Sequence, residues 1–307
     1  MPNQPSQRRV KTKPYKSFRL HKRVGAARPA KLTGAFKLFR ASTDHLLKHR
    51  WLFLGIVAIY MVLTIVMVKG LGVSVGTAEL KTNLEEIFVG SSGALLTGVT
   101  IFGVLLSSSS SASSDVASLY QTILVVLTSL AIIWALRQSF ADTKTTVKES
   151  FYKGMYPLIP FVLVLLMIGL QMLPLLVGSW LYSVVIVGGI AVTGLEQTIW
   201  VILIILLSLL SLYMITSSIF GLYIATLPDM TPLKALRSAR ELVRNRRFMV
   251  MRKVLFLPFI LLLVGAVIMV PLIILATPLA EWVFFILSMM VLVMIHAYMY
   301  NLYRELL

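Results

Sequence analysis

The sequence predicts an all-α, polytopic membrane helix bundle with about six transmembrane helices. Hydrophobic residues make up 58% of the 307 residues and charged residues only 13%, against about 45–50% and about 25% in soluble domains. A span needs about 20 mostly apolar residues to cross roughly 30 Å of hydrocarbon. The longest apolar runs are Trp51–Val68, Pro157–Val177, Trp200–Tyr213, Val254–Leu275 and Val283–Ala297.

The chain is expected to have a tail, residues 1–32, and an integral membrane domain, residues 33–307. The tail is rich in Pro, Gln, Ser, Lys and Arg and lacks an apolar period, which predicts disorder. An amphipathic helix is predicted from Gly34, with Phe36, Phe39 and Leu46 on one side and Lys37, Arg40, Asp44 and Lys48 on the other. No small-residue cleavage site follows the first apolar run, so we interpret that run as a retained span.

We place the spans at about residues 51–68, 119–136, 157–177, 198–226, 255–275 and 282–300. Two other apolar stretches are ambiguous. Gly93–Leu106 has only fourteen residues, a length typical of interfacial, re-entrant or buried segments. Leu181–Val192 is rich in glycine and is expected at the outer interface. The serine-rich stretch Ser107–Ser114 is interpreted as a solvated linker.

The distribution of positive charge predicts the topology. With the amino terminus inside and six crossings, the inner segments carry 27 of the 29 Lys and Arg residues, and such residues favour the cytoplasmic side. An alternative with eight spans, which adds the two ambiguous stretches, gives a weaker partition of 23 to 6. We therefore expect a multi-pass protein of the cytoplasmic membrane with both termini in the cytoplasm. The basic residues flank the membrane and form no nucleic-acid motif, so anionic lipid head groups are the expected partners and nucleic acid is not.

Two parts of the chain resemble each other. Pro160–Leu165 parallels Pro258–Leu263, and a second proline follows 14 residues later at Pro174 and 13 residues later at Pro271. The first proline of each pair is expected in the first turn of its span, and the second at a kink or termination. The segments before the first and fifth spans are also alike. The proposed unit is a basic amphipathic helix, an outgoing span and a returning span, used three times.

The segment before the fifth span has the clearest helix signals. Thr231 is a good N-cap residue and Pro232 suits the first helical position. Four cations, at Lys234, Arg237, Arg240 and Arg244, are candidate contacts to lipid head groups. The helix is expected to lie in the interface with its apolar side down. It serves either as a surface for lipids or a partner, or only as a determinant of orientation.

This segment, Pro232–Val243, resembles a Pro-x-x-Ala-Leu-x-x-Ser motif of six-span bacterial membrane proteins, the glycerophosphodiester phosphodiesterase membrane-domain group and its YciC-like relatives. Ala239 follows Ser238 here, so the register of the small residue is approximate. The run Ser17–Arg23 is similar to that of uncharacterised membrane proteins of candidate-phylum bacteria. The resemblance implies an architecture and no activity, because the phosphodiesterase chemistry of that group belongs to a separate soluble domain.

Catalytic, cofactor-binding and metal-ligating patterns are not predicted. The chain has no cysteine and four histidines, and it contains no HExxH pair and no phosphate-binding glycine loop. His296 and Gln171 lie within predicted spans and are the candidates for an intramembrane polar site; a histidine satisfied by a neighbouring helix is the alternative. We expect a non-enzymatic envelope or lipid-interacting protein without a cofactor. The alternatives are a transporter or lipid-translocating protein and, third, an intramembrane enzyme.

Overall fold

The computed structural model describes residues 33–68, 101–103, 105, 115–244 and 246–307. All regular secondary structure in these ranges is helical, and six of the helices there are long and apolar enough to cross a membrane. The prediction of an all-α, polytopic membrane bundle is confirmed. The predicted tail, the serine-rich linker and most of Gly93–Leu106 lie outside the described residues.

The described chain combines long helices with short ones. The long helices are α2 (Arg50–Met67), α5 (Asp115–Phe140), α7 (Leu158–Gln171) with its continuation α8 (Leu173–Tyr182), α9 (Gly194–Ala225), α11 (Arg247–Leu275) and α12 (Thr277–Leu306). The short helices are α1 (Ala35–Lys48), α6 (Val147–Gly154) and α10 (Pro232–Val243). We call the end of the bundle at which the short helices lie the basic end.

Two helices differ from the sequence-based expectation. The stretch expected at the outer interface begins as the end of α8, which continues as a π-helical turn, Ser183–Val187, and this turn ends at Gly188. Helix α11 begins at Arg247, eight residues before the predicted span. Pro258 therefore lies inside that helix and not in its first turn.

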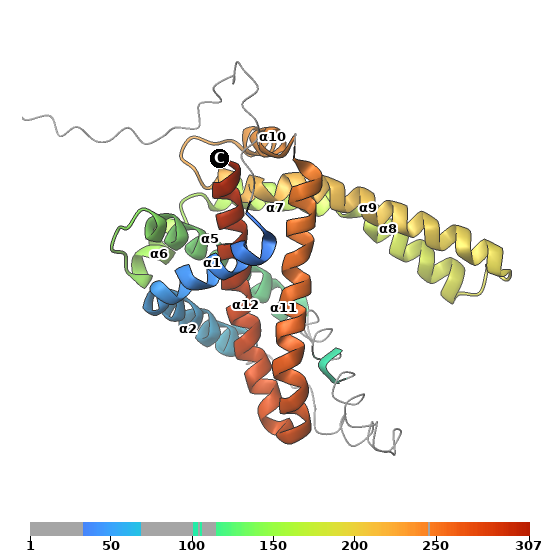
Figure 1. Ribbon diagram of the computed structural model, residues 1–307, viewed down its shortest axis with the longest axis horizontal. Coiled ribbons are helices and arrows are strands. Elements are labelled where there is room, and N and C mark those ends of the chain that lie inside the picture. Colours follow the sequence, from blue (N-terminus) through green and yellow to red (C-terminus); the bar gives the residue numbers. More distant parts are fainter. Residues whose placement is uncertain (1–32, 69–100, 104, 106–114, 245) are drawn as a thin grey trace, which may run out of the picture. The chain divides into compact units, whose positions relative to one another are not determined.

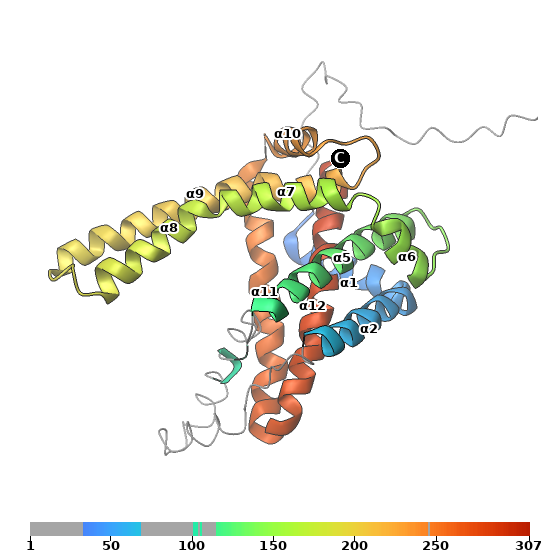
Figure 2. The same cartoon turned by 180° about the vertical axis from the view of Figure 1, so that it is seen from behind.

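The short helices and the long helices follow one contact scheme that recurs three times. Each short helix packs on a long helix that runs toward the basic end: α1 on α12, α6 on α5 and α10 on α9. Each short helix also contacts a helix that runs away from it: α1 contacts α11, α6 contacts α2 and α10 contacts α7. Figures 1 and 2 show α6 beside α5 and α10 beside the end of α9. The scheme matches the threefold use of one unit. The contacts of α1 with α11 and α12 connect the first of the described helices to the last two.

The turns before α6 and α10 share an uncommon backbone conformation. Among the described non-glycine residues, only Asp142 (φ 53°) and Asp229 (φ 60°) have a positive φ, a conformation in which Asn and Asp are enriched. Each aspartate follows an incoming helix and precedes the N-cap threonine of a short helix, Thr146 or Thr231. The two loops are therefore alike in backbone as well as in position.

The long helices are packed unevenly. The buried side chains of α9 all lie in its second half, from Ser211 onward, while most of the first half is exposed and lies beside α8 in both views. Near α11 and α12, Ile101, Phe102 and Leu105 are buried in one apolar cluster with Met269, Ile273 and Ala280. The described part of Gly93–Leu106 is thus packed against other helices, one of the expected alternatives.

Candidate functional site

The four cations of α10 lie on one exposed face. Lys234, Arg237, Arg240 and Arg244 are all exposed. The opposite face does not lie toward lipid, because Ala235, Leu236, Ser238, Ala239 and Val243 are buried and the helix packs on α9 and α7. The expectation of an apolar side directed toward lipid is therefore wrong. Protein covers that side, and the exposed face carries the four cations together with Leu233 and Glu241.

Small residues let α10 approach α9 closely. Ala235 and Ala239 have no exposed surface, and a Cβ atom added at Gly221 of α9 would lie 3.1 Å from Cδ2 of Leu236. Small side chains at helix interfaces permit such close contacts. The residues that carry the sequence resemblance, Ala235 and Leu236, are thus the ones that fix the short helix to the bundle.

His296 lies buried where three incoming helices meet. Its Nδ1 atom is 3.1 Å from the hydroxyl oxygen of Tyr223 on α9, and Tyr223 also packs against the rings of Tyr300 and Tyr303. Tyr300 in turn contacts Phe140 of α5. The histidine is therefore held by a neighbouring helix, which was the alternative to a functional pocket.

Gln171 is remote from His296. It ends α7, and the helix break that follows leaves the backbone N–H of Leu175 to donate to Oγ of Ser211, at 3.1 Å. Ser211 lies twelve residues before Tyr223 on α9, which corresponds to about 18 Å along a helix. Oε1 of Gln171 is buried and has no hydrogen-bond partner within the described part of the chain. The predicted polar pair does not form one site.

Further polar contacts join helix ends at the basic end. Arg137 on α5 donates to the carbonyl oxygen and the hydroxyl of Thr226 at the end of α9, at 2.9 and 2.5 Å. Nε2 of His45 on α1 is 2.8 Å from Oγ of Ser139 on α5. The eight-span alternative would separate residues 137–156 from both His45 and Thr226, so these contacts favour the six-span arrangement.

His45 stands in a basic and aromatic setting. Its ring stacks on Phe140 with centroids 3.7 Å apart. Burial, followed by the neighbouring His49, Arg304 and Lys48, lowers the pKa of His45 to about 4. The guanidinium of Arg304 also lies 4.2 Å from the centroid of the Phe140 ring. At neutral pH His45 is therefore uncharged and holds α1 to α5 through its ring and one hydrogen bond.

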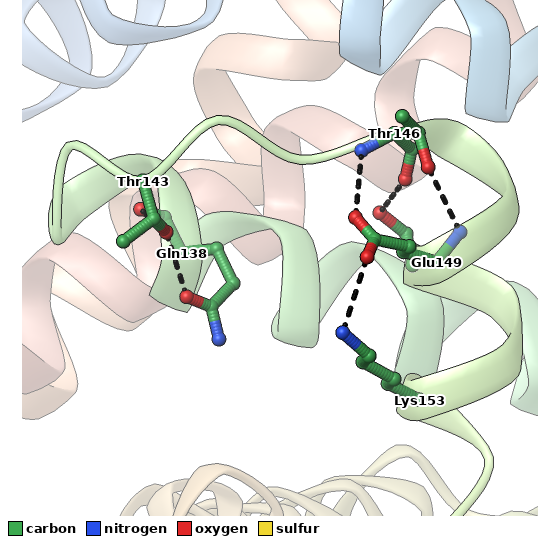
Figure 3. A network of polar contacts seen from close by, with 6 residues as sticks. Gln138, Thr143, Thr146, Glu149 and Lys153 are labelled. Carbon is green, nitrogen blue, oxygen red and sulfur yellow. Dashed lines mark hydrogen bonds and ion pairs between the residues drawn. The ribbon is translucent and has the colours of Figure 1, made fainter.

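The loop between α5 and α6 is fixed by its own side chains. Figure 3 shows the capping box in which Thr146 and Glu149 bind each other's backbone N–H groups. Lys153 donates to Glu149 at 3.1 Å, and this hydrogen bond lowers the pKa of the Glu149 carboxyl. Thr143 donates to Oε1 of Gln138 on the other side of the turn. The loop is thereby held in one conformation beside the α1–α2 junction.

Reasoning from the sequence missed several of these residues. Tyr223, Ser139 and Ser211 were not singled out, because a single hydroxyl in an apolar helix gives no periodic signal. Arg137 was not singled out either. Its position one turn from a helix end, where a cation can reach carbonyl groups of neighbouring helices, was the available signal.

The described residues hold no group of three or more His, Asp or Glu side chains that could bind a metal ion. The fold and these surfaces define a multi-pass helical membrane protein. Comparison with known protein families, curated proteins and solved structures gives no match.

Proposed function

We propose that this protein is a non-enzymatic membrane protein that binds anionic lipid head groups through its basic short helices, on the cytoplasmic face of the inner membrane. The observation that carries the proposal is the arrangement of α10. Its buried face packs on α9 and α7, and its four cations are all exposed. The cations are therefore presented from a helix that is fixed on the bundle.

Charge energetics support an anionic partner. A Lys or Arg side chain near an anionic membrane surface contributes about 1 kcal/mol. The exposed apolar side chains of Leu233 on α10 and Phe248 at the start of α11 would suit the boundary between head groups and acyl chains. The cations of this face form no recognisable nucleic-acid motif.

The transporter alternative has less support. A transport path needs polar groups that converge on a cavity near the middle of the spans. His296 is engaged with Tyr223, and Gln171 lies at a different level of the bundle. The two candidate polar residues therefore do not converge on one cavity.

The test is retention of phosphatidylglycerol by the purified protein, measured by native mass spectrometry in detergent with phosphatidylcholine as the reference lipid. Replacement of Lys234, Arg237, Arg240 and Arg244 by Gln should weaken phosphatidylglycerol binding at least about tenfold, which corresponds to about 1.4 kcal/mol. A control variant exchanges Lys for Arg and Arg for Lys at the same four positions, which keeps every charge. Equal retention of phosphatidylglycerol in the Gln variant and the control would refute the proposal.

A further inference from the structure

Two open cavities lie at equivalent positions of the repeated unit. The first, of about 570 Å³, lies between the α1–α2 junction and the α5–α6 loop. The second, of about 1070 Å³, lies between the α6–α7 junction and the α9–α10 loop. Each is therefore formed where the start of an outgoing helix meets the loop of the next unit.

The two cavities share the chemistry of their lining residues. Each contains a lysine from the last turn of a short helix, an aromatic residue near the start of the outgoing helix, the aspartate with positive φ, and the N-cap threonine of the next short helix. In the first cavity these are Lys48, Trp51, Asp142 and Thr146. In the second they are Lys153, Tyr156, Asp229 and Thr231.

Opposite charges line each cavity. Nζ of Lys48 lies 4.0 Å from Oδ1 of Asp142, and both side chains are largely exposed. The pair is wide enough to be separated by a bound group, and exposed pairs of this kind contribute little stability. In the second cavity Asp229 is exposed. Nζ of Lys153 lies 5.8 Å from the centroid of the Trp134 ring and is paired with Oε1 of Glu149 at 3.1 Å, so a bound phosphate would compete with Glu149 for the lysine.

The aromatic residues place these cavities at the depth of lipid head groups. Trp51 is 79% exposed and Tyr156 is 90% exposed, and each lies where a long apolar helix begins. Exposed Trp and Tyr side chains at the ends of transmembrane helices are typical of the membrane interface. Their rings also bind ammonium groups by cation–π interaction.

We propose that the two cavities are paired sites for a zwitterionic head group of the phosphoethanolamine type. The lysine and the threonine hydroxyl bind the phosphate, and the aspartate and the aromatic ring bind the ammonium. This inference rests on the proposed lipid-binding function and names a second lipid class for a different surface. A head group with a phosphate and no cation would leave the carboxylate of each cavity facing a negative charge.

The aspartates carry the argument because their turns do not require a charge. Asn adopts a positive φ as readily as Asp, so the backbone alone would accept either residue at positions 142 and 229. Of these two residue types only Asp supplies a carboxylate, and Asp is present in both cavities. Replacement of both aspartates by Asn therefore removes the proposed ammonium ligand and keeps the turns.

The experiment uses the full chain with Asp142→Asn and Asp229→Asn together, and native mass spectrometry with phosphatidylethanolamine and phosphatidylglycerol. We expect phosphatidylethanolamine retention to fall about tenfold while phosphatidylglycerol retention stays the same. Unchanged retention of phosphatidylethanolamine, or an equal loss of both lipids, would overturn the inference. A charge-retaining variant, Asp142→Glu with Asp229→Glu, should keep more phosphatidylethanolamine than the Asn variant.

Soluble O-phosphoethanolamine distinguishes the sources of the head group. If it raises the thermal unfolding temperature of the wild type but not of the Asn variant, the sites accept the free head group. If only the lipid binds, the acyl chains contribute and the membrane is the source. Failure of the α10 variant to lose phosphatidylglycerol would refute the proposed function and leave the phosphatidylethanolamine result to be judged separately.

Discussion

The ion pair between Lys253 and Glu305 should be the most costly polar contact to break at the basic end. Nζ of Lys253 on α11 lies 3.1 Å from Oε2 of Glu305 on α12, and the two side chains are only 7% and 22% exposed. The carbonyl oxygen of Lys253 also accepts a hydrogen bond from the hydroxyl of Tyr298, and Thr33 donates to Glu305. The pair therefore joins α11, α12 and the segment that leads into α1.

The burial of this pair sets the expected magnitude. Removing one partner of a buried ion pair leaves an uncompensated charge and typically costs about 3–5 kcal/mol. Because Glu305 is partly exposed, water can reach the remaining charge, so we expect the lower end of that range, about 3 kcal/mol, for Glu305→Gln. Changing both residues, with Lys253→Met and Glu305→Gln, removes the isolated charge and should recover about 2 kcal/mol of the loss.

The assay is reversible unfolding in detergent micelles with added sodium dodecyl sulfate, followed by tryptophan fluorescence. The four proteins of the double-mutant cycle give the coupling free energy between the two residues. A coupling below about 0.5 kcal/mol, with the two single effects simply additive, would show that the pair is solvated in the folded protein. It would refute the assignment of Lys253 to the protein interior.

Two further results are expected. Gly154→Ala should lower the free energy of unfolding by about 1–3 kcal/mol, because the new Cβ atom would lie 3.1 Å from the Cα atom of Ala131 and from the carbonyl oxygen of Leu130. The control is Gly169→Ala, whose Cβ atom meets no atom within 4 Å and which should not destabilise the protein in the same unfolding assay. Equal effects of the two substitutions would contradict the close packing of α6 on α5. The pKa of His45 is lower in the folded protein than its ordinary value of 6.5, so the unfolded chain binds more protons than the folded chain between about pH 6.5 and 4. The free energy of unfolding should therefore fall as the pH falls through that range. We expect a loss of about 1 kcal/mol at pH 5 after allowance for solvent screening. His45→Gln should show a smaller fall in unfolding temperature between pH 7 and pH 5, and an equal fall would exclude His45 as its source.

The sequence predicts the long helices well and their packing partners poorly. Apolar length and the partition of positive charge together identify the six candidate spans, and the helix signals at Thr231 and Pro232 locate the start of α10. Along the spans, however, side chains that face lipid and side chains that face protein are equally apolar, so hydrophobic periodicity cannot show which faces meet. The same limit explains why the buried face of α10 was assigned to lipid.

Charge was also only partly informative. It indicated one end of the bundle, and contacts such as that between Arg137 and Thr226 join helix ends assigned to that side. The fifth span was predicted to start at about residue 255, which is too late, because α11 begins at Arg247 and includes the charged residues Arg252 and Lys253. Lys253 can lie inside α11 because Glu305, 52 residues later, provides its counter-charge, and a local window does not detect such a partner.

The closure of the contact scheme by α1 and α12 has a consequence for biogenesis. Helix α1 is made first, yet its main packing partner is the last helix of the chain, and Ser42 meets Asn301 across 259 residues of sequence. Contacts of such long sequence separation form late, because the intervening chain must first be ordered. During synthesis, α6 and α10 can dock as soon as the helix before them is in place, whereas α1 must wait for α12. Among the described helices, α1 is therefore the last to reach its place.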